Sequence, residues 1–167
     1  MNSTKIDNLY VPSTIKIIES LKPNEIPQRR VDVDKILLEK IRNKYGNKCI
    51  HSGFIQKNSI DILERSIGSI NSAHFNGEVY YNVRAQVRIC SPNIGSHISC
   101  QVIGKNQAGI FCVAYPLQIM LSPENHDDMT IFDTLKKGDS IVAEVLRQQI
   151  LLNHDHIKIL GKFVKKN

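Results

Sequence analysis

The sequence predicts an α+β protein of two modules, a helix-backed sheet followed by a closed five-stranded barrel. Residues 1–90 hold one stretch with helical spacing among β-like stretches, and a long alternating ribbon then ends at Ser91-Pro92. Five further β-like segments follow at once. With 167 residues the chain is long enough for one domain or two small ones. We therefore expect one domain over 1–90 and another over 91–167.

The first module begins with a strand, a loop and a helix. Residues 9–19 are rich in β-branched side chains, and residues 21–30 contain two prolines, so we expect a strand and then a loop. Asp32 or Asp34 is the expected N-cap of a helix that ends at Gly46. Its apolar residues recur every three or four positions and so form one buried stripe. The stripe consists of Val33, Ile36, Leu37, Ile41 and Tyr45.

Strands follow the helix. Short β-like runs occupy residues 49–55 and 59–64, and the ribbon begins at Glu78. Apolar and polar residues alternate along the ribbon, which predicts an antiparallel strand with one dry face and one wet face. The dry face consists of Val79, Tyr81, Val83, Ala85, Val87 and Ile89. We expect the helix to cover one face of the resulting sheet.

The second half of the sequence predicts a β-barrel. Its β-like segments are residues 98–104, 109–115, 117–122, 140–150 and 156–163. The longest insertion lies between the third and fourth segments, which is the layout of a Greek-key OB barrel. Gly109 and Gly138 stand where such a barrel needs tight turns. Pro92 and Gly95 are expected to make the bend that leads from the ribbon into the barrel.

Charge and composition restrict the possible partners. The net charge is +6, with 14 Lys and Arg against 9 Asp and Glu in residues 1–90, and 8 against 7 in residues 91–167. RNA, an acidic protein surface and an ordinary solvated surface all account for this excess. Ile, Asn and Lys number 24, 14 and 15, a bias typical of an A/T-rich genome.

No membrane or secretion signal stands out. No apolar stretch approaches the roughly 18 residues of a membrane span, and the polar start MNSTKIDN lacks the apolar core of a secretory signal. We therefore expect a soluble intracellular protein without a membrane partner.

Metal and catalytic signatures are weak. The cysteines form no C-x-x-C pair, so we expect reduced, mostly buried thiols; they are Cys49, Cys90, Cys100 and Cys112. The clusters His154-Asp155-His156 and His126-Asp127-Asp128 are read as solvated turns rather than metal clips. No G-x-S-x-G, G-x-x-x-x-G-K-[ST] or H-E-x-x-H motif occurs. We expect no catalytic residue, metal or cofactor.

Six stretches together resemble one protein family. They are the helix ending near Tyr45-Gly46, G-F-I at 53–55, I-D-I-L-E-R-S-I-G-S-I at 60–70, V-x-A-x-V-x-I-x-x-P-x-x-G at 83–95, V-x-x-x-x-x-x-G-I-F at 102–111, and P-L-x-I at 116–119. In this order they resemble the stalk subunit of multisubunit RNA polymerases, which is subunit seven in eukaryotic polymerase II and has a direct counterpart in archaea. The resemblance covers roughly residues 9–164.

This resemblance implies a truncated RNP-like tip domain in residues 1–90 that docks on the polymerase core near the clamp. The implied docking residues are Gly53, Phe54, Ile55, Gln56, Lys57, Asn58, Ile67 and Gly68. Ordinary hairpin loops are the alternative for these residues. The implied partners are the large core subunits, small core subunits near the clamp and a second stalk subunit. The composition and short loops suggest a large DNA virus, and hence the nucleus, or a cytoplasmic viral factory and the virion.

The second half separately resembles the S-one-type OB module of RNA-binding proteins. The matching residues are Gly109 to Val113, Ile119 to Ser122 and Gly138-Asp139. This resemblance implies contact with nascent RNA through Lys105, Phe111, Tyr115, Arg147, Lys158 and Lys162. Alternation leaves Phe111 either in the barrel core, which we favour, or on a base-stacking outer face. Lysines at strand ends are also ordinary surface residues.

The leading hypothesis is a non-catalytic stalk subunit of a DNA-dependent RNA polymerase that acts in transcription. Its contact with RNA would be weak, salt-sensitive and tolerant of sequence. The alternative is a free-standing OB-fold RNA-binding factor in translation initiation or RNA processing. A third hypothesis is an α+β enzyme, which requires a deep pocket with converging ionisable groups.

Overall fold

The computed structural model describes residues 9–70, 72–73, 76–126 and 130–166, which form two compact units. The barrel unit consists of the described parts of Met1–Val11, Lys48–Phe54 and Ile89–Asn167. The sheet unit consists of the described parts of Pro12–Asn47 and Ile55–Arg88. The division is therefore more complex than a single cut after residue 90, because two segments of the first half belong to the barrel unit. No described helix is long and apolar enough to cross a membrane.

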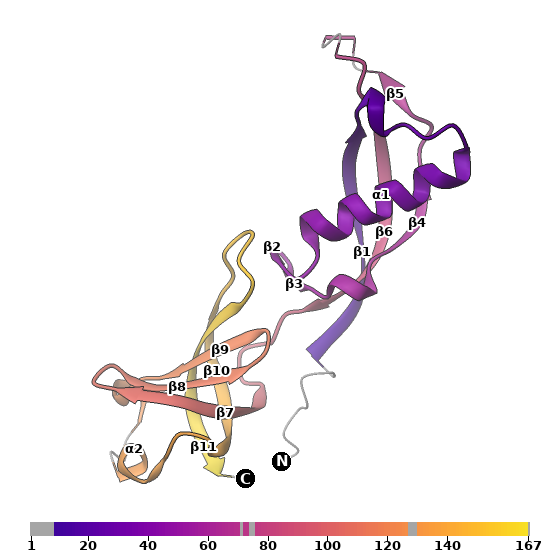
Figure 1. Ribbon diagram of the computed structural model, residues 1–167. Coiled ribbons are helices and arrows are strands. Elements are labelled where there is room, and N and C mark those ends of the chain that lie inside the picture. Colours follow the sequence, from indigo (N-terminus) through magenta and orange to yellow (C-terminus); the bar gives the residue numbers. More distant parts are fainter. Residues whose placement is uncertain (1–8, 71, 74–75, 127–129, 167) are drawn as a thin grey trace. The chain divides into compact units, whose positions relative to one another are not determined.

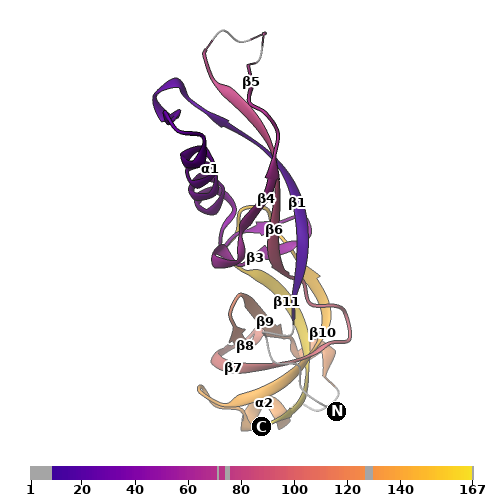
Figure 2. The same ribbon diagram turned by 90° about the vertical axis from the view of Figure 1, so that its right-hand side faces the viewer.

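The open sheet is organised around β6, and α1 runs along one of its faces (Figures 1 and 2). The sheet order is β1-β6-β3-β2, and β4 and β5 also pair with β6. Its elements are β1 (Tyr10–Leu21), α1 (Arg30–Tyr45), β2 (Cys49–Ile50), β3 (Gly53–Ile55), β4 (Asp61–Arg65), β5 (Ser69–Ile70) and β6 (Val79–Cys90), with short 3-10 turns at Pro23–Glu25 and Lys57–Ser59. The predicted first strand, proline loop, helix and ribbon are thus confirmed.

Alternation in β6 is as predicted from Tyr81 onward, whereas Val79 and Tyr80 at its start are both half-buried. Tyr81, Val83, Ala85, Val87 and Ile89 are buried, whereas the polar residues between them are exposed. From the helix, Val33, Leu37 and Ile41 are buried, while Ile36 and Tyr45 are half-buried.

The helix begins earlier than predicted. Its N-cap is Arg29, in an extended conformation, and no side chain caps it, so neither Asp32 nor Asp34 is the cap. Asp32 lies in the first turn, where a carboxylate is favoured by the helix dipole. Asp34 instead forms an ion pair with Arg65 of β4. The cap prediction failed because both acids have other favourable roles.

The run 49–55 is a two-stranded hairpin rather than one strand. Cys49 lies opposite Phe54, and Ile50 lies opposite Gly53. Gly53 has φ +138°, and a Cβ at this position would collide with the carbonyl oxygen of Cys90. Glycine permits this close approach of the two backbones because it has no Cβ and adopts such a φ without strain.

The barrel contains all five predicted strands: β7 (His97–Asn106), β8 (Gly109–Ala114), β9 (Leu117–Leu121), β10 (Ser140–Gln149) and β11 (Ile157–Lys166). They close in the order β7-β8-β9-β11-β10 and back to β7. The pair β9–β11 is parallel and the other pairs are antiparallel. This closed, mostly antiparallel barrel is consistent with an OB-like fold. The long insertion carries α2 (Thr130–Thr134) and a 3-10 turn at Pro123–Asn125.

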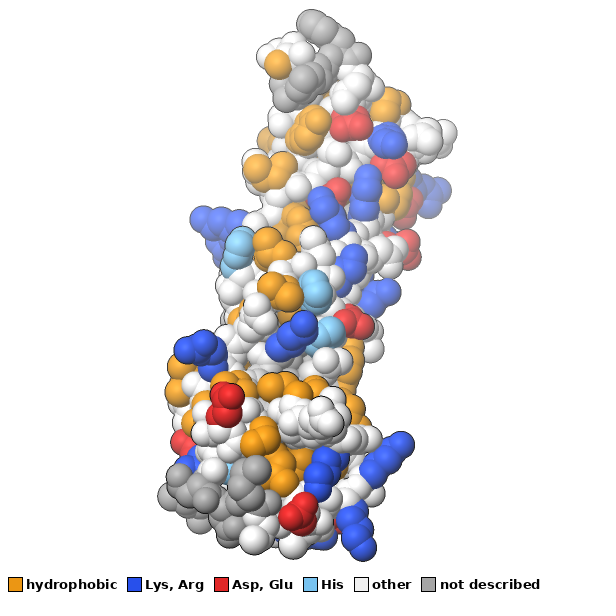
Figure 3. All heavy atoms as spheres, turned by 90° about the vertical axis from the view of Figure 1, so that its left-hand side faces the viewer, with side chains coloured by type: hydrophobic (Ala, Val, Ile, Leu, Met, Phe, Trp, Pro, Cys, Tyr) orange, Lys and Arg blue, Asp and Glu red, His pale blue; other side chains and the backbone are white. Residues whose placement is uncertain are grey.

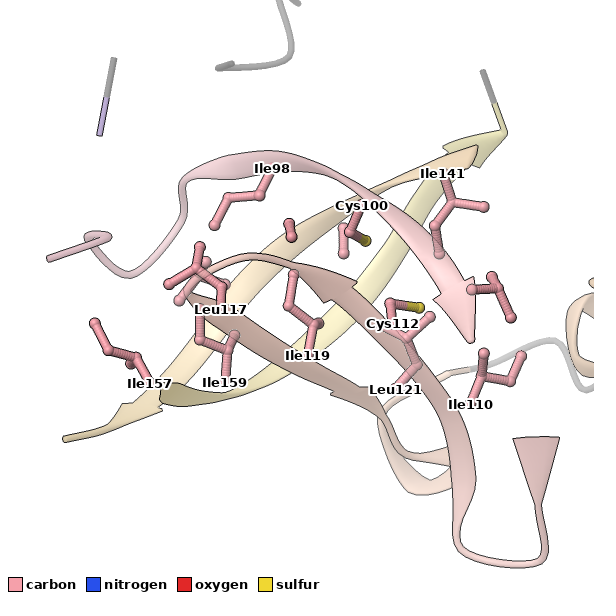
Figure 4. Packing of buried hydrophobic residues seen from close by; sticks show 14 of the residues in the cluster. Ile98, Cys100, Ile110, Cys112, Leu117, Ile119, Leu121, Ile141, Ile157 and Ile159 are labelled. Atoms are coloured by element: carbon pink, nitrogen blue, oxygen red, sulfur yellow. The ribbon is translucent and has the colours of Figure 1, made fainter. Parts of the chain in front are cut away.

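Alternate residues of the five strands fill the barrel (Figure 4). The labelled residues are Ile98, Cys100, Ile110, Cys112, Leu117, Ile119, Leu121, Ile141, Ile157 and Ile159. The four cysteines are free and buried, as predicted, and burial raises the pKa of Cys90 to about 12. A thiol with such a pKa stays protonated at neutral pH and serves as a small apolar core residue.

Glycines stand at the predicted bends. Gly109 has φ +142°, and a Cβ there would collide with the carbonyl oxygen of Leu121. Gly138 (φ +97°) lies in the turn before β10. The connection from β6 to β7 contains buried Pro92 and Gly95 (φ +85°), which confirms the predicted bend.

The insertion is fastened to the barrel by a buried histidine. Nε2 of His126 accepts a hydrogen bond from the backbone N–H of Phe163 at 2.8 Å. Nδ1 therefore carries the proton and donates to the carbonyl of Ser122 at 2.8 Å. The ring also packs edge-on against Phe132. The role of His126 is structural.

Candidate nucleic-acid interface

A row of outward-facing side chains crosses four strands of the barrel. Phe111 of β8 lies opposite Met120 of β9, and Met120 lies opposite Leu160 of β11. Leu160 in turn lies opposite Arg147 of β10. Directly opposed residues have Cβ atoms roughly 5 Å apart, so the four side chains are consecutive neighbours. We call Phe111, Met120 and Leu160 the apolar row, which ends at Arg147.

A polar row runs beside it. Gln118 of β9 lies opposite Lys158 of β11, and Lys158 lies opposite Gln149 of β10. Gln118 and Lys158 are each two residues from a member of the apolar row, so both rows occupy the same outer face. Their separation along the strands is roughly 7 Å.

The two rows line a pocket of about 520 Å³. Its lining also includes Ile103, which is the additional residue at a β-bulge in β7. Gly104, the residue opposite Phe111, has open space where a Cβ would stand. The missing side chain leaves one flank of the Phe111 position open. Inward-facing residues complete the lining: Cys112, Ile119, Gln148 and Ile159.

Two cations border the apolar row. Arg147 and Lys158 are exposed, and neither forms an ion pair within the described parts of the chain. They occupy diagonal positions on β10 and β11, roughly 7–8 Å apart. On the face that Figure 3 draws, Lys and Arg side chains are scattered among hydrophobic ones rather than gathered in one patch. An apolar surface with two free cations is suited to an anion that carries a flat apolar group.

Three of the six predicted RNA-binding residues line this pocket, namely Phe111, Arg147 and Lys158. Phe111 faces outward and is half-buried, so our preference for the core was wrong. The reason is that its neighbours Ile110 and Cys112 fill the barrel interior.

The other three predicted residues lie elsewhere. Lys105 binds the carbonyl of Phe132 and is 3.6 Å from a carboxylate oxygen of Asp133. Tyr115 follows the end of β8, where its ring meets Phe54 edge-on at 5.6 Å. Lys162 lies opposite Glu144, outside the pocket lining.

Sequence reasoning missed the aliphatic part of the pocket and its glutamines. Met120, Leu160 and Gln118 occupy outward positions that strand alternation alone identifies. The alternation does not say which outward residues become neighbours. That depends on the register between β9 and β11, which are far apart in the sequence.

The predicted docking residues fall into three groups. Gly53, Phe54 and Ile55 are buried within this chain. Gln56 to Asn58 lie beside one end of β6, where the backbone N–H of Gln56 donates to the carbonyl of Arg88.

Exposed Ile67 and Gly68 lie further along β6, because a Cβ on Gly68 would meet Val79 and Tyr81. Arg88 is seven positions after Tyr81, which corresponds to roughly 23 Å along a strand. The predicted docking residues therefore do not form one small patch.

The sheet unit has its own hollow, of about 680 Å³, between residues of β1, β4 and β6. Its lining consists of Lys16, Ile17, Ile18, Glu64, Arg65, Ser66, Asn82, Val83 and Arg84. Arg84 forms an ion pair with Glu64 at 2.9 Å, and Arg65 pairs with Asp34. Most charges here are already neutralised.

The histidine clusters show no metal geometry in the part of the chain that the structure describes. The Nδ1 atom of His156 lies 2.6 Å from a carboxylate oxygen of Asp155, and this hydrogen bond lowers the pKa of Asp155. Asp127 and Asp128 lie outside the described residues. Within the described residues, no three His, Cys, Asp or Glu side chains gather as metal ligands.

Comparison with known proteins finds a relative that matches along most of the chain. No protein-family model matches the sequence. The chain is 24% identical over 170 residues to a putative DNA-directed RNA polymerase subunit of Acanthamoeba polyphaga mimivirus, and the match covers 94% of this chain and 83% of that protein.

Proposed function

We propose that this chain is a non-catalytic subunit of a DNA-dependent RNA polymerase that acts in transcription. The observation that carries the proposal is the similarity to a putative viral polymerase subunit along 94% of the chain. The five-stranded barrel supports it, because three of the six stretches that resemble the polymerase stalk family, at 83–95, 102–111 and 116–119, fold into this barrel and the strand that leads into it. More specifically, we propose that the chain is the stalk subunit of this polymerase.

In this proposal the sheet unit is the RNP-like tip that docks on the polymerase core near the clamp. The candidates for contact are the half-buried Gln56 and Lys57 and the exposed Asn58, Ile67 and Gly68, and the side chain of Ile67 is 91% exposed. Gly53, Phe54 and Ile55 act indirectly, since they are buried and hold the hairpin in place. An isoleucine this exposed in a loop gains free energy when a partner covers it.

The outer-face pocket is the proposed contact with nascent RNA. Arg147 and Lys158 supply two phosphate contacts beside the apolar row. Two such contacts predict that the logarithm of the binding constant falls with the logarithm of salt concentration with a slope of about −1.4. RNA binding is therefore expected to be weak, salt-sensitive and supported by the rest of the polymerase.

The proposed location follows from the proposed role. A viral polymerase subunit works inside an infected cell, either in the nucleus or in a cytoplasmic factory, and it is packaged in the virion where transcription starts early. The proposed partners are the large core subunits and small core subunits near the clamp. A second stalk subunit is a further candidate.

Copurification tests the proposal. The tagged chain, expressed in the cells in which it naturally acts, is expected to recover the two largest polymerase chains at fixed stoichiometry. Ile67→Glu should reduce this recovery, because a charge would be buried in the contact. Ile94→Glu is the matched control, since Ile94 is also exposed but lies in the barrel unit.

Recovery of ribosomes or free RNA without polymerase chains would reject the proposal. That result would favour the second candidate, a free-standing RNA-binding factor in translation initiation or RNA processing. The observation that keeps this candidate open is the pocket itself, which lies wholly within the barrel unit.

A further inference from the structure

The outer-face pocket has an apolar floor and a polar wall with two amides. The apolar row forms the floor, and Gln118 and Gln149 stand on either side of Lys158 in the wall. A nucleobase has the same division, with apolar faces and a polar edge. A base lying on the floor would turn its edge toward the glutamines.

The side-chain amides of Gln118 and Gln149 favour one base over the others. Gln118 and Gln149 are exposed, and neither side chain has a hydrogen-bond partner in the described parts of the chain. A glutamine amide pairs bidentately with the N6 amino group and N7 of adenine. Guanine presents two acceptors at this edge, which would face the amide oxygen. Pyrimidines cover less of the apolar floor than a purine does, and stabilisation by burial follows the covered area.

We propose that this pocket binds one unpaired adenine of the transcript and that Gln118 and Gln149 determine the specificity. The inference rests on the proposed RNA contact and adds its base preference. Arg147 and Lys158 bind the flanking phosphates, because they form no ion pair with any described residue and lie on diagonal positions beside the floor. Their contribution is the same for every base.

The pocket fits a base better than it fits a peptide. An amphipathic helix needs apolar anchors spread over several turns, whereas the floor is one residue deep along each strand. An extended peptide usually binds by adding to a sheet edge. The closed barrel offers no such edge.

The amino-acid composition of the chain gives a separate argument for adenine as the bound base. Every codon for Ile, Asn and Lys begins with A, and these residues number 24, 14 and 15 of 167. The message that encodes this chain is therefore rich in adenine. A polymerase that transcribes such genes would pass many adenines by a pocket near its transcript.

Fluorescence anisotropy with labelled octamers of single-stranded RNA tests the proposal on the whole chain. Oligoadenylate is expected to bind about fivefold or more tightly than oligouridylate or oligocytidylate at low salt, the lower limit for one bidentate base contact. Gln118→Leu with Gln149→Leu should lower adenine binding to the uridine level and leave uridine binding unchanged. Gln86→Leu, an exposed glutamine of the sheet unit, is the control.

Several outcomes would overturn the inference. Equal affinity for the three octamers would leave the pocket without base preference, as would a preference that survives in the double glutamine variant. Displacement of oligoadenylate by an acidic, leucine-rich peptide at lower concentration than by unlabelled oligoadenylate would assign the pocket to a protein partner. Copurification with polymerase is independent of all three results, so failure here is distinct from failure of the proposed function.

Discussion

The outer surfaces of the two units differ in how their charges are satisfied. In the hollow of the sheet unit, Arg84 and Arg65 each pair with a carboxylate of the same chain. In the barrel pocket, Arg147 and Lys158 stand beside apolar side chains without such a pair among the described residues. Charges paired within the chain gain little from a ligand, whereas free cations beside an apolar floor gain contacts when an anion binds. The two hollows are similar in size, but only the barrel pocket is expected to gain charge contacts when an anionic ligand binds.

The largest expected effect separates two phenylalanines of the barrel unit. Phe54→Ala should lower the free energy of unfolding by about 3–5 kcal/mol, because Phe54 is fully buried and packs against Tyr115. Phe111→Ala should cost about 1 kcal/mol, since its ring is half-buried on the outer face, yet abolish preferential RNA binding. Urea unfolding followed by circular dichroism, together with RNA titration, measures both. Equal losses of stability would contradict the assignment of Phe111 to the surface.

His126 tests whether the insertion is part of the barrel or an independent loop. His126→Ala should destabilise the barrel unit by about 1–3 kcal/mol, because the N–H of Phe163 loses its acceptor. His154→Ala is the control, since its exposed side chain accepts no hydrogen bond from a described backbone N–H. The midpoint of thermal unfolding checks both variants. An unchanged midpoint for His126→Ala would show that the insertion is not held by this histidine.

Matched pairs of cations test the difference between the two surfaces directly. Arg147→Ala with Lys158→Ala should flatten the salt dependence of RNA binding from a slope of about −1.4 toward zero. Over a fourfold rise in salt, the wild-type slope corresponds to a loss of about 1 kcal/mol. Lys16→Ala with Arg84→Ala, from the hollow of the sheet unit, should leave the slope unchanged. A change of similar size in both pairs would remove the distinction between the surfaces.

The smallest expected effect is a pH dependence of the barrel. Asp139 accepts hydrogen bonds from Nζ of Lys166 at 2.8 Å and from the backbone N–H of Lys136 at 2.9 Å, and these lower its pKa below the usual 3.8. A lowered folded-state pKa gives stability that is present above the unfolded pKa and lost as pH falls through the folded value. Asp139→Asn should therefore lose stability at neutral pH and show a weaker acid dependence below about pH 4.

Asp133→Asn is the control for this titration, because its exposed carboxylate has one lysine at 3.6 Å. Acid unfolding curves of the two variants and the wild type, measured in the same buffer series, give the comparison. Identical acid dependence of wild type and Asp139→Asn would contradict the role assigned to the carboxylate.

Strand positions could be predicted from the sequence, whereas the grouping of side chains across strands could not. The alternation in residues 79–90 and the five barrel segments define local structure, which depends on neighbours in the sequence. The row from Phe111 to Arg147 depends on pairing between β8, β9, β11 and β10, and the register shift at Val145 and Arg147 decides that Arg147 meets Leu160. Such long-range register carries no signal in a single sequence.

The hairpin at 49–55 shows the same limit. The sequence predicts one β-like run there, and the resemblance to the stalk family implies that Gly53, Phe54 and Ile55 dock on the polymerase core. The structure buries Phe54 in the core of the barrel unit, because Cys49 bonds to the backbone of Asn153 and His154. Burial of this kind depends on a segment about a hundred residues later, so local patterns predict the β-like residues but neither the hairpin nor its burial.

The bonds between Cys49 and the segment 153–154 join parts of the barrel unit that are synthesised far apart in time. Cys49 is synthesised early, yet its partners Asn153 and His154 emerge almost at the end of translation, so the hairpin of the nascent chain lacks these bonds for most of its synthesis. A fragment that begins at residue 91 would lack Cys49 and Phe54 altogether. Expression of that fragment should yield aggregates that the co-expressed segment 9–90 prevents.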